Sequence, residues 1–183
     1  MQPTTHSPLL ETLRDPHAAA GRVEFEGRYR PALLGFARRV GLSDHEVDEA
    51  VGATLEAFVR ELRAGRLDGR SDSMSELLFD VARTHIADAS LSAQDVLSSP
   101  GELEEIWKAE WRRAIVRRAL DELYLDESEN SHVLQAFELH CLEKHPADEV
   151  ASELGMSHSA VFRAKSRLMD RLRERVKQLE AEF

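Results

Sequence analysis

The stretch from Ala147 to Lys177 constrains the fold of this chain more than any other part of the sequence. Its apolar residues follow helical spacing on both sides of Gly155, a residue that tolerates the positive φ at which chains often leave a helix. Ala151 is small enough for a second helix to cross closely, and Val161 is the apolar residue that would pack back. Ser157 is placed to cap the second helix through its hydroxyl. We therefore predict two helices joined by a tight turn, the arrangement of a helix-turn-helix.

The second of these helices has an apolar side and a basic side. Residues at three- and four-residue steps form a stripe that we expect to be buried: Val161, Ala164, Leu168, Leu172, Val176 and Leu179. Another set points largely away from that stripe: Ser159, Phe162, Arg163, Ser166 and Arg167. From Ser157 to Phe183 there are seven Lys or Arg against four Asp or Glu, whereas the whole chain has a formal net charge of −10. A basic helix on an acidic protein favours DNA binding at one end of the chain, and the alternative is a helical hairpin with a solvated basic face.

The composition indicates an all-α protein. Ala, Leu, Glu and Arg dominate, while 9 Gly and 6 Pro in 183 residues leave few breaks between helices. This length suggests one or two small domains. A single cysteine, Cys141, excludes an intramolecular disulfide framework. No apolar run approaches the roughly 20 residues that span a bilayer, and the first residues do not follow the pattern of a signal peptide, so we expect a cytoplasmic protein without a membrane span.

Helical periodicity and polar breaks suggest how the chain is divided. Ser43 and Glu46 have the spacing of a capping box at the start of a helix. The helices that we expect are 18–40, 44–64, 74–89, a long segment within 102–131, and 133–143. A polar run ending in Ser98-Ser99-Pro100-Gly101 is typical of a linker. We predict an N-terminal leader at 1–17, a helical domain at 18–90, a linker at 91–109 and a helix-turn-helix domain at 110–183.

Several stretches resemble a known family, among them SPLLETLRDP, which is similar to a short leader in variants of it. FEGRYRPALLGFARRVGLSDHEVDEAV is similar to the opening helices of domain two in RNA polymerase sigma factors of the extracytoplasmic-function class, and ELLFDVARTHIADA is similar to the last helix of that domain. VLQAFELHCLEKHPADEVASELGMSHSAVFRAKSRLMDRLRERV resembles domain four of the same class. The resemblance covers most of the chain outside the linker. It implies a transcription initiation factor whose partners are RNA polymerase core and promoter DNA, with an anti-sigma factor as a further candidate.

The resemblance also implies site residues. A DNA-binding surface for the −35 promoter element would comprise Ser157, His158, Ser159, Phe162, Arg163, Lys165, Ser166 and Arg167. Arg163 and Arg167 are the best candidates for contacts with phosphates or guanine. A polymerase-binding surface would include Asp48, Glu49, Gly52 and Ala53, and a contact with −10 DNA would involve Arg83 and His85.

Departures from the family pattern leave two other functions open. Gly52 stands where the family usually has glutamine, Ala53 where it has an acid, and His85 where it commonly has a basic residue. Each lost phosphate contact removes one counterion-release contribution to DNA binding. The alternatives are a degenerate sigma-like interaction module, or a stand-alone helix-turn-helix regulator that does not melt promoters.

The sequence does not favour an enzyme. It has no Gly-rich phosphate loop and no Ser-His-Asp or Cys-His motif context. His140, Cys141 and His145 are close in sequence, but at i, i+1 and i+5 they do not share one helical face, and there is no second cysteine. We therefore expect no catalytic residues, no metal site, no cofactor and no small-molecule substrate.

Overall fold

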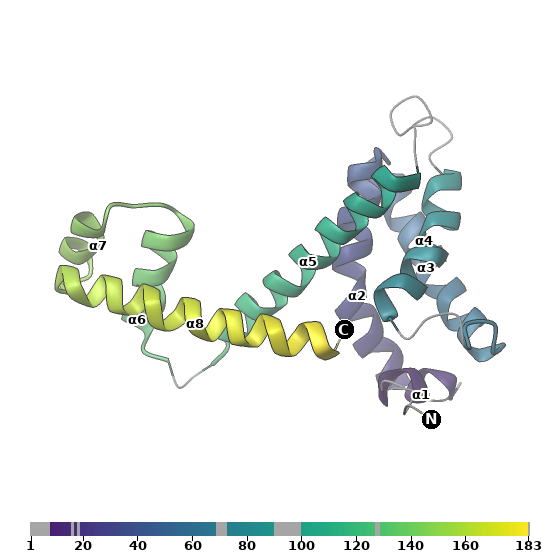
Figure 1. The fold of residues 1–183 in the computed structure, drawn as a ribbon, viewed down its shortest axis with the longest axis horizontal. Helices are drawn as coiled ribbons and strands as arrows, with labels where there is room; N and C mark the ends of the chain where they lie inside the picture. Colours follow the sequence, from purple (N-terminus) through teal and green to yellow (C-terminus); the bar gives the residue numbers. More distant parts are fainter. Residues whose placement is uncertain are drawn as a thin grey trace. The chain divides into compact units, whose positions relative to one another are not determined.

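A computed structural model describes residues 8–15, 17, 19–68, 73–89, 100–126 and 129–182 (Figure 1). Within these ranges every regular element is a helix, which confirms the predicted all-α class. The chain divides between Ala114 and Ile115 into two compact units, and the division falls inside a helix.

The first unit buries an aromatic core. Its helices are α1 (Pro8–Arg14), α2 (Ala19–Val40), α3 (Asp44–Arg63), α4 (Met74–Ala89) and the first part of α5 (Pro100–Tyr124). Its largest fully buried side chains are Phe25, Tyr29, Phe36, Phe58 and Trp107. Helix α3 packs against both α2 and α4. The predicted capping box at the start of α3 is confirmed: the backbone N–H of Ser43 donates to the Glu46 carboxylate at 2.8 Å.

The start of α5 belongs to the first unit. Trp107 is 2% exposed and its indole N–H donates to Ser75 Oγ at 2.9 Å. Trp111 stacks on Tyr29 with 5.5 Å between ring centroids. The sequence predicts a linker at 91–109 and a second domain from residue 110, whereas residues 100–109 form a helix and the division lies at Ala114. Packing of two tryptophans, Trp107 buried and Trp111 half-buried, against the first core extends that unit, and residues 91–99 lie outside the described residues.

The second unit holds the rest of α5, α6 (Ser131–Phe137), a π-helical segment η1 (Glu138–Leu142), α7 (Ala147–Glu153) and α8 (His158–Glu182). Helix α6 begins at an Asn130 cap, whose side chain accepts from the N–H of His132 at 2.9 Å. Where the sequence predicts one helix over 133–143, the hydrogen bonding changes to the π pattern at Glu138. Helix α8 packs against α6, η1 and α7.

Candidate nucleic-acid interface

The turn between α7 and α8 has the local structure that the sequence indicates. Gly155 has a φ of +61°, and the N–H of Met156 donates to the carbonyl of Ala151 at 2.9 Å, which closes the end of α7. The Ser157 hydroxyl accepts from the N–H of Ala160 at 3.2 Å, so it caps α8 as predicted. The glycine and the serine thus fix where α7 ends and where α8 begins.

The predicted stripe on α8 is the packed side of that helix. Val161, Ala164, Leu168 and Leu179 are buried, and Leu172 and Val176 are half-buried. Val150 of α7 and Ala136 of α6, both 0% exposed, share a cluster with Val161 and Ala164. Ala151, expected to sit at the closest crossing, is only half-buried, and the fully buried small residue of this cluster is Ala136. Sequence reasoning missed Ala136 because nothing local to α6 shows which helix will cross it.

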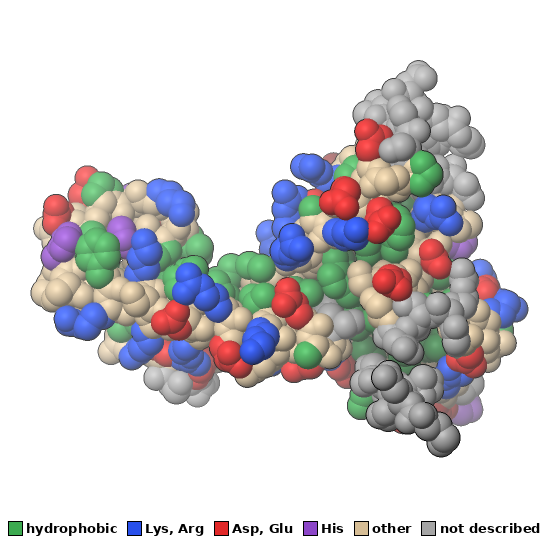
Figure 2. Space-filling view, in the orientation of Figure 1, with side chains coloured by type: hydrophobic (Ala, Val, Ile, Leu, Met, Phe, Trp, Pro, Cys, Tyr) green, Lys and Arg blue, Asp and Glu red, His purple; other side chains and the backbone are tan. Residues whose placement is uncertain are grey.

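The opposite side of α8 and its first turn carry most of the predicted DNA-binding set, while Lys165 lies closer to the buried stripe, four residues after Val161 and three before Leu168. All eight of these residues are exposed: Ser157, His158, Ser159, Phe162, Arg163, Lys165, Ser166 and Arg167. Figure 2 shows Lys and Arg side chains on the unit that contains α7 and α8, beside a hydrophobic patch and histidines. The structure therefore leaves all eight predicted residues accessible on the first half of α8 and its cap.

Two carboxylates that sequence reasoning missed form ion pairs with arginines of α8. The Glu129 carboxylate accepts from the guanidinium groups of both Arg167 and Arg171, and Asp126 accepts from Arg171. The Glu129 side chain is only 6% exposed. The acidic run from Asp126 to Ser131 was the available signal, but its spacing does not show which cations it would meet. Arg167 is therefore already ion-paired in the free protein.

Arg163 and Lys165 differ from Arg167. The Arg163 guanidinium donates to Ser159 Oγ at 3.2 Å, one helical turn earlier. Neither Arg163 nor Lys165 forms an ion pair with any residue that the structure describes. Of the Lys and Arg residues in the predicted set, these two are thus the ones most available to an anionic partner.

A hollow of about 670 Å³ lies beside this surface. It is lined by Val133, Met156, Ala160, Phe162, Arg163, Ala164, Ser166 and Arg167. Apolar side chains from the α7–α8 turn, α6 and α8 are combined there with two guanidinium groups from α8. The surface is therefore concave and amphipathic rather than uniformly charged.

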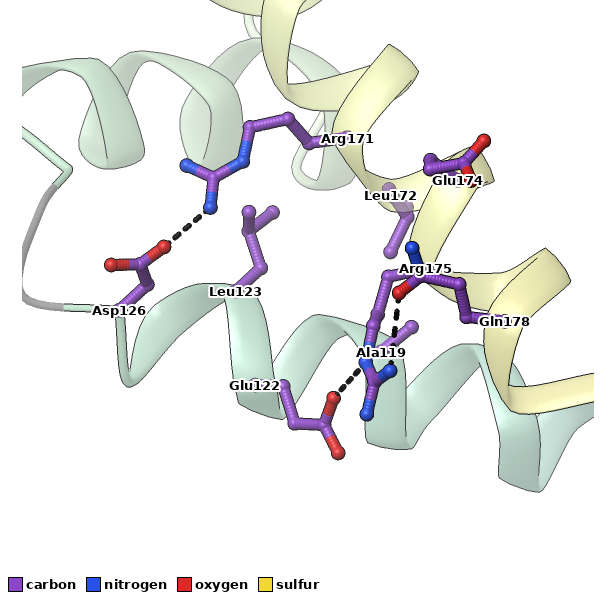
Figure 3. Close-up of a pocket in the computed structure, with 9 residues that line it drawn as sticks. All are labelled: Ala119, Glu122, Leu123, Asp126, Arg171, Leu172, Glu174, Arg175 and Gln178. Carbon is purple, nitrogen blue, oxygen red and sulfur yellow. Dashed lines mark hydrogen bonds and ion pairs between the residues drawn. The ribbon is translucent and has the colours of Figure 1, made fainter. Parts of the chain in front are cut away.

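A second hollow, of about 430 Å³, lies between the end of α5 and α8 (Figure 3). Arg175 donates to Glu122 and, at 3.2 Å, to Gln178 Oε1, while Arg171 pairs with Asp126. The hydrogen bond from Arg175 lowers the pKa of Glu122, and the Arg118 bond adds to this effect. The arginines of this hollow are ion-paired within the unit, so we interpret these pairs as contacts that stabilise the packing of α5 against α8.

The other predicted site residues lie in the first unit. On α3, Asp48, Glu49 and Ala53 are exposed and Gly52 is half-buried. A Cβ built at Gly52 meets no atom within 4 Å, so this part of α3 is open surface. On α4, Arg83 is exposed and His85 is half-buried. The four α3 positions form one accessible patch without a glutamine or a third acid.

His140, Cys141 and His145 are not arranged as a set of metal ligands. His140 Nδ1 lies 2.9 Å from the carbonyl oxygen of His145, and burial raises the pKa of the half-buried Cys141 thiol. Across the described ranges no group of three His, Cys, Asp or Glu side chains is arranged to hold a metal ion. Among the helices described, none combines the length and apolar character needed to cross a membrane.

Comparison with known proteins gives no match: no family model, no curated protein and no solved structure matches this chain. Its function is therefore inferred from its own residues, their geometry and the resemblance of its sequence to sigma factors.

Proposed function

We propose that this protein is a transcription initiation factor of the sigma type, which binds RNA polymerase core and directs it to promoter DNA through α7 and α8. One observation carries the proposal. The eight residues expected at the DNA surface are all exposed on the first half of α8 and its cap, and two of their cations, Arg163 and Lys165, have no acidic partner among the described residues. A helix presented in this way after a tight turn suits the major groove of DNA.

The proposed mechanism uses binding alone, with no catalytic step. Helix α8 enters the major groove, where Arg163 and Lys165 contact phosphates or guanine and the hydroxyls of Ser159 and Ser166 lie within reach of base edges or the backbone. Arg167 approaches DNA as part of its ion pair with Glu129, so it contributes less net charge than its neighbours.

In this proposal the first unit supplies the polymerase contact. The exposed carboxylates Asp48 and Glu49 on α3 are the groups that would meet a basic surface of core polymerase. Arg83, exposed on α4, would meet the phosphates of the downstream single strand. We propose a cytoplasmic location on the same grounds, since both partners are there.

A second candidate is a sigma-like interaction module or stand-alone regulator that does not open DNA. It is favoured by the α3 patch, where Gly52 and Ala53 present no polar side chain, and by half-buried His85 on α4, at a position where the family commonly has a basic residue. In this case α8 still binds duplex DNA, but the first unit engages a partner without melting a promoter.

Core polymerase pull-down with the full chain at two salt concentrations tests the proposal, together with duplex binding and run-off transcription from a genomic promoter pool. A sigma-type factor is expected to retain polymerase at both salts, to bind duplex DNA and to yield transcripts. Polymerase retention without transcripts would favour the interaction module. Duplex binding without polymerase retention would favour the stand-alone regulator. If the chain neither retains polymerase nor binds duplex DNA, the sigma-type factor, the interaction module and the regulator are all contradicted.

A further inference from the structure

Phe162 is an exposed aromatic residue that packing of the second unit does not explain. It lies in the second turn of α8, and 44% of its surface is accessible. Its position is on the same side of the helix as Ser159, Arg163 and Ser166, away from the buried stripe. The ring therefore lies on the surface that would face DNA.

Two histidine rings pack against the Phe162 ring. The His140 ring lies edge-to-face with it at a centroid distance of 5.4 Å, and the His158 ring does so at 4.9 Å. Such edge-to-face pairs are favourable because the positive edge of one ring meets the negative face of the other. Figure 2 shows a hydrophobic patch flanked by histidine on this unit.

Each histidine is itself held in place. His140 lies on the π-helical segment, and its Nδ1 lies 2.9 Å from the carbonyl oxygen of His145, an acceptor, so Nδ1 must carry the proton. His158 Nε2 lies 3.2 Å from the Asp148 carboxylate of α7. The His140 ring of η1 and the His158 ring, which Asp148 of α7 holds, thus restrict Phe162, and an aromatic side chain held in this way loses little freedom on binding.

The surroundings of the ring indicate what it would contact. The cations Arg163 and Lys165 are close to it in the chain and exposed, while the phenyl ring has no hydrogen-bonding group. The partner should therefore offer an apolar group close to several anions. In the major groove the thymine C5-methyl is the apolar group on a base edge, and phosphates line the groove on both sides.

We infer that Phe162 is a specificity-determining residue that recognises a thymine through its C5-methyl group. This inference deepens the proposed function and rests on α8 binding duplex DNA. His140 and His158 act as positioning residues, since they touch the phenyl ring and set its direction.

Replacement of thymine by deoxyuridine, which lacks only the methyl group, tests the inference without changing the protein. A duplex is first selected from a random library with the full chain, and each thymine in it is then replaced singly. At one thymine the substitution should weaken binding about fourfold, the effect of losing burial of one group of CH₂ size. The salt dependence of binding should not change, because no charge is altered.

Variants assign the effect to the ring. Phe162→Ala should bind thymine and deoxyuridine duplexes equally, whereas Phe162→Leu, which keeps an apolar side chain, should retain part of the difference. His140→Gln should reduce the thymine preference with the salt dependence unchanged, which a general loss of structure would not do.

The outcomes separate this inference from the proposed function. Duplex binding with no thymine–deoxyuridine difference at any position would overturn the role of Phe162 alone, and so would a difference that persists in Phe162→Ala. If no duplex is selected or bound at any salt concentration, the proposed function fails and this inference fails with it.

Discussion

Arg163 and Lys165 provide the most direct test at the scale of single residues. Each is exposed on α8 and unpaired among the described residues, so each should neutralise a phosphate when DNA binds. Arg163→Gln or Lys165→Gln should make the slope of log K against log salt less negative by about 0.9, the value for one lost phosphate contact. Duplex binding measured by fluorescence anisotropy across a salt series checks this expectation.

Arg173→Gln is the matched control for this pair. Arg173 is exposed on the same helix and its ion pair is with Asp170, three residues earlier. Its replacement also removes one positive charge, but lies farther along α8 than the predicted surface. Equal slope changes in all three variants would mean that net charge, and not a located contact, governs DNA binding.

Glu129 should restrain DNA binding through Arg167. Its carboxylate is 6% exposed and accepts from both Arg167 and Arg171. Glu129→Gln removes this negative charge and leaves both guanidinium groups without it. We expect tighter, more salt-dependent duplex binding, together with a loss of stability of about 1.5–3 kcal/mol, typical of hydrogen bonds to charged groups. Duplex titration and urea denaturation measure the two effects.

A charge-matched variant identifies the cause. Glu180→Gln also removes one negative charge, at an exposed position of α8, the helix that carries Arg167. If it raises the duplex affinity as much as Glu129→Gln does, release of Arg167 is not the explanation. If Glu129→Gln destabilises the chain without raising affinity, the carboxylate serves only the fold.

Residue by residue, the sequence predicts exposure better than it predicts pairing. The exposure of Arg163 and Ser166 follows from the 3.6-residue period, because the same period buries Val161 and Leu168. The pairing of Arg167 with Glu129 joins residues 38 apart in the chain. It depends on the path between α5 and α6, which helical periodicity does not specify.

At the scale of elements, the α7–α8 turn should be sensitive to its glycine and its serine. Gly155→Ala places a Cβ at a φ of +61° and Ser157→Ala removes the hydroxyl that accepts from Ala160, so each should cost about 1 kcal/mol of stability. Urea denaturation followed by circular dichroism measures both. Ser166→Ala, a hydroxyl removed from the interior of α8, should leave stability unchanged or slightly higher; a loss as large as that of Ser157→Ala would rule out a specific capping role.

The ion pair between Glu122 of α5 and Arg175 of α8 should depend on pH. The hydrogen bond from Arg175 lowers the pKa of Glu122 below the ordinary glutamate value of 4.5. A carboxylate with a lower pKa in the folded state contributes stability above its unfolded pKa, and this contribution is lost as the pH falls through the folded value. Stability should therefore decline on acidification below about pH 5, and less steeply in Glu122→Gln.

Urea denaturation at several pH values checks this. Wild type and Glu122→Gln should differ in stability at neutral pH and converge at acidic pH. Parallel pH profiles of the two proteins would show that Glu122 does not titrate differently in the folded and unfolded chain.

Elements bounded by local signals are the ones that the sequence predicts well. Helix α4 spans Met74–Ala89 as expected, and the Ser43–Glu46 box marks the start of α3. The π-helical segment at Glu138–Leu142 has no such signal, since its hydrogen bonding depends on packing around it. The predicted linker extends to residue 109, past the start of α5, for a similar reason: the polar, Pro-Gly beginning of this helix is typical of a linker, while burial of Trp107 depends on distant partners such as Phe36 and Phe79.

At the scale of the whole molecule, the two units have separate cores. Phe58 is 0% exposed in the first unit, in a cluster that also contains Trp107, while Leu168 is 0% exposed in a cluster of the second unit. The chain has two tryptophans, Trp107 and Trp111, and both lie before the division at Ala114. Tryptophan fluorescence therefore reports on the first unit, whereas circular dichroism reports on helices of both.

This difference predicts how core variants will unfold. Leu168→Ala should lower the stability of the second unit by about 2–5 kcal/mol and shift part of the circular dichroism transition, while the fluorescence transition keeps its midpoint. Phe58→Ala should lower the stability of the first unit by about 3–5 kcal/mol and shift the fluorescence midpoint. Under conditions where the second unit remains folded, Phe58→Ala should still bind duplex DNA, because α7 and α8 belong to the other core. Equal shifts of both probes in each variant would instead mean that the chain unfolds as one cooperative unit, and that DNA binding by α8 depends on the first core as well as on its own.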